Sequence, residues 1–122
     1  MLEDARKLMA SMARILLAAV RDQAGDDWQK AYMSFECGDG YHFYSTSFSR
    51  DGRGVLMDPD LATEAGDLGD ELWEELVRKG HPFKVMLLTV SADGSYEVDF
   101  ERRNAKRWQI RLDEGYDGIP RD

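Results

Sequence analysis

The chain of 122 residues predicts a single domain over residues 1–122, long enough to bury a hydrophobic core of its own. Its content of 43% hydrophobic and 11% aromatic residues is typical of a globular protein and excludes a disordered one. The formal net charge of −8 argues against binding to nucleic acid or anionic membranes through bulk electrostatics, and it is compatible with a basic protein partner.

The N-terminal segment predicts a cytoplasmic protein. Two acids, Glu3 and Asp4, precede the first base, and the longest apolar run in this segment, Ile15 to Val20, has six residues. A signal peptide needs a basic start and a longer apolar run, and a membrane span needs roughly 20 apolar residues. The single cysteine, Cys37, excludes a disulfide within the chain and fits a reducing compartment.

Residues 2–24 predict an amphipathic helix, because apolar side chains recur there at steps of three and four residues. The stripe consists of Leu2, Ala5, Leu8, Met9, Met12, Ile15, Leu16, Ala19 and Val20. Gly25 is expected to end the helix. The stripe is interpreted as a face that packs on the core; a binding site for a partner helix is the minor alternative.

The period changes from helical to alternating in residues 28–57, which predicts three antiparallel strands. Ala31, Met33, Phe35 and Cys37 fall on one side of the first strand, before a hairpin turn at residues 38–40. The second strand covers residues 41–49 and is rich in aromatic side chains. A turn at Asp51-Gly52 leads into a short third strand, residues 54–57.

Helical spacing returns in residues 60–79, carried by Leu61, Ala65, Leu68, Leu72 and Leu76. Gly66 and Gly69 weaken the first half, since a glycine costs about 1 kcal/mol relative to alanine inside a helix. The firm helix is therefore expected only from near Asp67, and Gly80 followed by Pro82 ends it.

The remaining chain predicts an internal strand over residues 83–90 and a hairpin to a strand over residues 96–100. Trp108, Ile110 and Leu112 are consistent with a final edge strand, and residues 113–122 are expected to form a loosely held tail. The predicted fold is α+β, with an antiparallel sheet of about five strands, two helices packed on one face, and the order α-β-β-β-α-β-β.

The sequence favours a binding protein over an enzyme, with no catalytic residue, cofactor or metal. His42 and His81 lack metal-ligand spacing, and both are expected to be structural or surface residues. Cys37 with His42 as its base is a conceivable nucleophile pair, but lone cysteines are usually buried small hydrophobic residues. The carboxylates near Asp58 lack the twelve-residue loop of a calcium site, and acids are common at helix N-termini.

Residues 58–77 carry eight acids and no lysine or arginine, whereas the other 16 acids of the chain are matched by its 16 bases. We call this stretch the acidic segment. Its acids are Asp58, Asp60, Glu64, Asp67, Asp70, Glu71, Glu74 and Glu75. On a helix, Asp67, Asp70, Glu71 and Glu74 would share a face and repel one another. Two interpretations stay open: a solvated helix face, or a partner-binding surface that docks on a basic site as a mimic of a phosphate backbone.

A basic group follows in residues 102–111, consisting of Arg102, Arg103, Lys106, Arg107 and Arg111. Pairing with the protein's own acids is favoured for this group over binding to nucleic acid.

The layout resembles the YezG-like family of bacterial immunity proteins, the antitoxins of polymorphic toxin systems. The matching residues are Trp28 at the opening of a strand, Leu72-Trp73 in the second helix, and the hairpin over residues 93–100. The resemblance implies a protein that binds and neutralises a cognate secreted toxin domain. With the acidic segment, it leads to the hypothesis that the toxin is a nuclease whose active site is blocked by an acidic surface. The alternative is a cytosolic adaptor or regulatory binding protein without a toxin partner.

Overall fold

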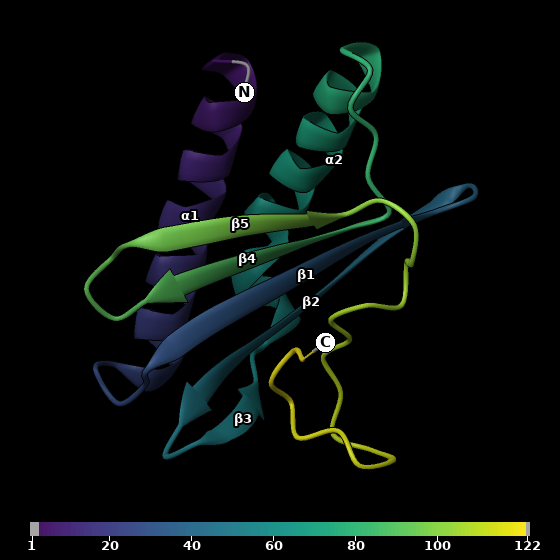
Figure 1. The fold of residues 1–122 in the computed structure, drawn as a ribbon. Helices are drawn as coiled ribbons and strands as arrows, with labels where there is room; N and C mark the ends of the chain where they lie inside the picture. The colour runs from purple at the N-terminus through teal and green to yellow at the C-terminus, as the bar shows by residue number, and fades with distance from the viewer. Residues whose placement is uncertain (1–2, 122) are drawn as a thin grey trace.

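The computed structural model describes residues 3–121 and confirms the predicted α+β fold and element order. The elements are α1 (Glu3–Ala24), β1 (Lys30–Gly38), β2 (Tyr41–Arg50), β3 (Arg53–Leu56), the 3-10 turn η1 (Pro59–Ala62), α2 (Thr63–Arg78), β4 (Val85–Ser91) and β5 (Tyr96–Glu101). All strand pairs are antiparallel, in the spatial order β3-β2-β1-β4-β5, and both helices cover one face of the sheet (Figure 1). The predicted helix start at Leu2 lies outside the described residues.

The central strand β1 alternates as its sequence predicts. Ala31, Met33, Phe35 and Cys37 are at most 3% exposed and join the core under the two helices. The residues between them face the opposite side of the sheet. Phe35 pairs across the sheet with Tyr44 of β2 on one side and Met86 of β4 on the other. The buried face of β1 therefore packs against the layer of the two helices.

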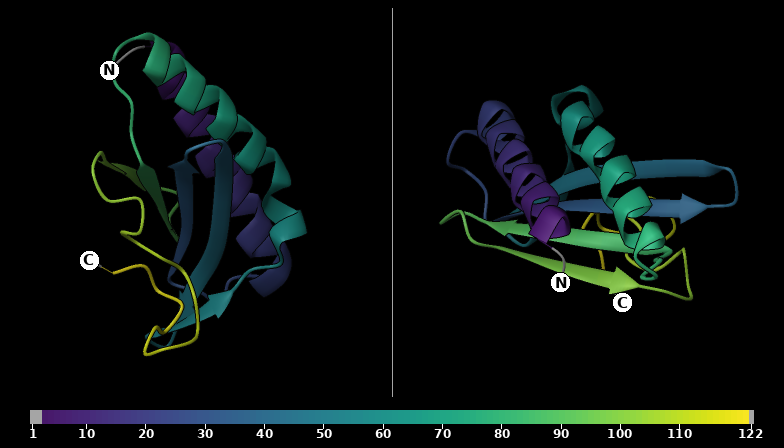
Figure 2. Two further views of the ribbon diagram at one scale, coloured as in Figure 1. Left: turned by 90° about the vertical axis from the view of Figure 1, so that its right-hand side faces the viewer. Right: turned by 90° about the horizontal axis from the view of Figure 1, so that it is seen from above.

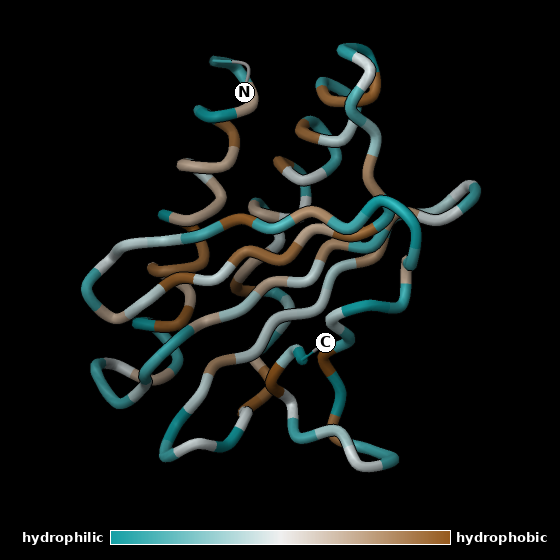
Figure 3. The backbone as a smooth tube through the Cα atoms, viewed as in Figure 1, coloured by the Kyte–Doolittle hydropathy of each residue, from teal (hydrophilic) through white to brown (hydrophobic). Residues whose placement is uncertain are grey.

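The two helices lie side by side and run in opposite directions across the sheet (Figures 1 and 2). The predicted stripe of α1 is buried through residues such as Met12, Leu16 and Val20, each fully buried. The matching residues of α2 are Leu72 and Leu76. Figure 3 shows the resulting alternation of apolar and polar segments along each helix. The stripe of α1 is thus a core face, as interpreted.

Helix α2 is continuous from Thr63, so the expectation that it would become firm only near Asp67 is wrong. The reason is the close approach of the helix to aromatic rings of the sheet. A Cβ atom added to Gly66 would lie 2.5 Å from the ring of Tyr44, and one added to Gly69 would lie 2.6 Å from the ring of Phe35. Because glycine has no side chain, the helix can pack directly against these two rings, and this packing stabilises its first half.

Residues 102–121 contain no strand, so the prediction of a final edge strand at Trp108, Ile110 and Leu112 is wrong. The backbone of Trp108 has a φ of 60°, which an extended strand cannot contain. Instead, this segment crosses the sheet face that the helices leave open, and we call it the C-terminal strap (Figure 2, left). Trp108 is 7% exposed and packs with Val85 and Leu87.

Hydrogen bonds and ion pairs fasten the strap to the sheet. Nζ of Lys106 lies 3.1 Å from the buried carboxylate of Glu36, and the guanidinium of Arg107 lies 2.9 Å from the partly buried carboxylate of Glu101. The amide of Gly54 in β3 donates to the carbonyl of Asp117, which lies in the last part of the strap, at 3.0 Å. The predicted pairing of basic residues with the protein's own acids is confirmed for Lys106 and Arg107. It is also confirmed for Arg111, whose guanidinium pairs with Asp113 and Glu114 of the strap itself.

Candidate functional site

The acidic segment forms η1 and α2, where local capping interactions explain its first residues. The side chain of Asp58 accepts a hydrogen bond from the amide of Asp60 at 3.0 Å, which caps η1 in the usual manner of an aspartate. Pro59 follows at the first position of the turn, where the backbone amide would have no partner within the turn, so the missing N–H of proline costs no hydrogen bond. Asp58 therefore has a local structural role in addition to its charge.

Four acids of the segment form an exposed row along α2, which we call the outer acidic row. Its members are Glu64, Asp67, Glu71 and Glu74. Their spacing of three, four and three residues places them on one face of the helix, away from the buried Ala65 and Leu72. Within residues 3–121, no ion pair neutralises any of the four carboxylates. The row is a line of unpaired negative charge.

Two of the predicted partner-binding acids are instead engaged within the protein. Asp70 was expected on the same face as the row, but its carboxylate lies 2.5 Å from Nδ1 of His42 on β2. Glu75 is only 8% exposed, and its carboxylate pairs with Arg78. Asp70 therefore contacts β2, and Glu75 is engaged within α2 itself, so neither carboxylate belongs to the outer acidic row.

His42 and the residues around it attach the middle of α2 to the sheet. Its ring stands edge-on to Trp73 of α2, with centroids 4.9 Å apart, and to Phe35 of β1 at 5.4 Å. His42 therefore has the structural role that was predicted. His81 lies exposed after α2, where its amide donates to the carbonyl of Leu76 at 2.7 Å.

The environment of Cys37 argues against its use as a nucleophile. Cys37 pairs with His42 across the hairpin, and with Asp70 these are the side-chain types of a cysteine hydrolase. However, the thiol is 3% exposed, and burial together with the negative charges of Asp70 and Glu36 raises its pKa to about 12. At neutral pH the thiol stays protonated, whereas a nucleophilic cysteine needs a lowered pKa.

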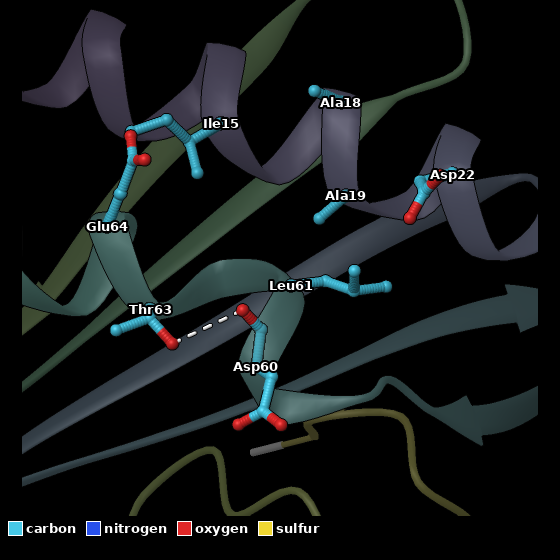
Figure 4. A pocket seen from close by; sticks show the side chains of 8 residues that line it. All are labelled: Ile15, Ala18, Ala19, Asp22, Asp60, Leu61, Thr63 and Glu64. Carbon is cyan, nitrogen blue, oxygen red and sulfur yellow. Dashed lines mark hydrogen bonds between the residues drawn. The ribbon is translucent and has the colours of Figure 1, made fainter.

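A groove of about 530 Å³ lies beside the acidic segment, between the C-terminal half of α1 and η1 (Figure 4). It is lined by Ile15, Ala18, Ala19, Asp22, Asp60, Leu61, Thr63 and Glu64. Figure 4 shows the carboxylates of Glu64 and Asp22 toward opposite ends of the groove, whereas that of Asp60 points away from α1. The sequence reasoning missed Asp22, because only the packing of α1 against η1 brings this residue beside the acidic segment.

No protein-family model and no curated protein matches the chain. Within the part of the chain that the structure covers, no helix is long and apolar enough to cross a membrane. Over the same residues, no three or more His, Cys, Asp or Glu side chains gather where they could hold a metal ion.

Proposed function

We propose that this chain is an immunity protein that neutralises a cognate secreted toxin domain by covering a basic active-site surface with its outer acidic row. The observation that carries the proposal is the row itself. Glu64, Asp67, Glu71 and Glu74 are exposed and unpaired within residues 3–121, and they lie in the segment that holds the net charge of the chain. A helix shaped only for stability would have its acids mixed with lysines, because like charges three or four residues apart repel each other.

The spacing of the row suits a surface that normally binds a phosphate backbone. Residues three or four apart on a helix are separated by about 4.5–6 Å along its axis. The phosphates of one DNA strand follow each other at about 3.4 Å along the duplex axis. The row therefore offers a line of negative charge on a similar scale, which favours a nuclease as the toxin. Opposite charges on the two proteins would also accelerate their association.

The resemblance of the sequence layout to YezG-like immunity proteins is the second support for the proposal. Trp28 precedes β1, is 6% exposed, and its indole donates to the carbonyl of Gly25 at 3.0 Å. Asp93 and Ser95 form the turn between β4 and β5, where the aspartate accepts from the serine amide at 2.9 Å. The features that suggested the family therefore have defined structural roles in this chain.

The proposal predicts that a neighbouring gene encodes a secreted protein with a toxin domain, and co-expression with that domain tests it. The variant Asp67→Lys, Glu71→Lys, Glu74→Lys should lose protection and co-purification while its circular dichroism spectrum stays that of the folded protein. Asp70 is left unchanged because it holds α2 through His42. A matched control with the same change in charge, Asp26→Lys, Glu97→Lys, Asp99→Lys, alters exposed acids elsewhere and should still protect. Full protection by the first variant would overturn the proposal.

The adaptor alternative in which the basic group binds nucleic acid receives less support. Lys106, Arg107 and Arg111 are engaged with acids of the protein itself. Salt-dependent binding of an oligonucleotide that disappears on removal of residues 102–122 would favour this alternative.

A further inference from the structure

We propose that the groove between α1 and η1 is a socket for one arginine or lysine side chain presented by a protein partner. This inference rests on the proposed function, which supplies a partner with a basic surface. It adds a defined anchoring point to a surface that would otherwise bind through charge alone.

The floor of the groove is apolar and comes from two elements. Ile15 and Leu61 are partly buried, Ala19 is 4% exposed, and Ala18 is exposed at the helix surface. The small side chain of Ala19 leaves the space open between α1 and η1, and Ala18 lies at the outer edge of the groove (Figure 4). Such a floor suits the aliphatic part of a long basic side chain, which packs on apolar surface while its charged end stays near water.

The charged groups of the groove are complementary to that end. Glu64 reaches toward Ile15, and Asp22 stands at the opposite end (Figure 4). Over residues 3–121, neither Asp22 nor Glu64 has an ion-pair partner. A guanidinium or ammonium group seated above the floor would therefore find a carboxylate toward either end. An anionic group would be repelled, and a purely apolar one would cover these two charges without replacing their hydration.

Hydrogen bonds hold the two sides of the groove together. The side chain of Gln23, next to Asp22, accepts from the amide of Asp58 at 2.9 Å and thereby joins the end of α1 to η1. Within η1, the amide of Leu61 donates to the carbonyl of Asp58 at 3.1 Å. From β2, the hydroxyl of Tyr44 donates to the carbonyl of Pro59 at 3.2 Å. A site fixed in this way needs little ordering when a side chain enters it.

The groove can be tested separately from the outer acidic row, because Glu64 is the one residue that the two surfaces share and it stays unchanged in every variant. The probe is a hexa-arginine peptide, titrated by calorimetry into the full-length chain at physiological salt concentration. Ala18→Phe places a bulky ring at the edge of the groove without changing any charge, and Asp22→Asn removes one charge of the groove. Two matched controls are Ala92→Phe and Asp26→Asn, which alter exposed residues away from the groove.

The expected result is about a fivefold or larger rise in Kd for Ala18→Phe and about a twofold to fivefold rise for Asp22→Asn. Both controls should bind within about twofold of the parent protein. Circular dichroism checks that each variant is folded. If one of the two groove variants is unfolded, the Kd of the other still tests the proposal.

A third variant, with Asp67, Glu71 and Glu74 all changed to asparagine, distinguishes the two proposals. If both groove variants bind like the parent while this variant binds weakly, the socket is overturned and the acidic row stands. If the groove variants weaken binding and this variant does not, the socket stands and the row fails as the docking surface. Parent-like binding by all three variants would overturn both.

Discussion

Nδ1 of His42 lies 2.5 Å from Oδ1 of Asp70, and this contact joins β2 to the middle of α2. Asp70 is one of eight acids in a segment without lysine or arginine, yet it faces the sheet rather than the outer acidic row. The negative charge of α2 therefore has two uses. One part fixes the helix on the sheet, and the other part is displayed.

Replacement of Asp70 should cost stability without removing displayed charge from the row. Asp70→Asn is expected to lower the free energy of unfolding by less than about 1 kcal/mol, because half of the Asp70 side chain is exposed to water. Urea unfolding measures the change. Asp67→Asn removes an exposed acid of the row and should leave stability unchanged or slightly higher. Equal unfolding midpoints for Asp70→Asn and the parent protein would contradict a holding role.

Alanine in place of Gly69 should destabilise the protein, although alanine favours helix formation by about 1 kcal/mol. The added methyl group would meet the ring of Phe35 at 2.6 Å, and overpacking of this kind costs about 1–3 kcal/mol. Thermal unfolding of Gly69→Ala checks the sign. In a double-mutant cycle, Phe35→Leu should recover part of the loss, because it removes the ring that the new methyl group meets. Higher stability of Gly69→Ala would refute the close-approach account.

These glycines also show where sequence reasoning reaches its limit. Hydrophobic periodicity predicted the helices, the strands and their order, because each element carries its pattern locally. The hydrophobic pattern carries no information on the distance between two elements. The sequence therefore shows only the low helix propensity of Gly66, and not its close packing against the ring of Tyr44.

The candidate site was predictable to a similar extent. Composition located the acidic segment, but the loss of Asp70 and Glu75 to internal contacts and the arrival of Asp22 from α1 depend on tertiary packing.

The strap should contribute strongly to stability through Trp108. Trp108→Ala is expected to lower the free energy of unfolding by about 3 kcal/mol, because the indole covers Val85 and Leu87 on the open face of the sheet. Leu112→Ala is a control in the same segment, since Leu112 is 56% exposed, and its effect should stay within about 0.5 kcal/mol. Chemical denaturation of both variants gives the comparison. Similar small losses for the two would show that the strap is not part of the packed structure.

Stability should also depend on pH through Glu101. Its carboxylate accepts hydrogen bonds from the amides of Arg103 and Asn104 and from the guanidinium of Arg107, which lowers its pKa from 4.5 to about 2. A carboxyl group whose pKa is lower in the folded state stabilises that state above pH 4.5, and the contribution disappears as the pH falls toward 2.

The difference in melting temperature between the parent protein and Glu101→Gln tests this dependence. The difference should be greatest at neutral pH and should shrink between pH 4.5 and 2. A difference that stays constant through this range would contradict the proposed role of the ionised carboxylate.

Cys37 should resist alkylation in the folded protein. Burial raises the pKa of its thiol to about 12, so both access and ionisation are unfavourable at pH 8. Iodoacetamide labelling followed by mass spectrometry should show negligible modification in buffer and complete modification in guanidinium chloride. Rapid labelling of the folded chain would mean that the thiol is open to solvent.

The strap also sets the order in which the molecule can be completed during synthesis. Residues 102–121 follow every helix and strand that the structure describes, so Val85 and Leu87 lack their cover until Trp108 has been synthesised. A nascent chain that stops after β5 would expose these two apolar side chains on a sheet face, a surface prone to association with other chains. Early termination should therefore produce an aggregating fragment rather than a smaller functional protein.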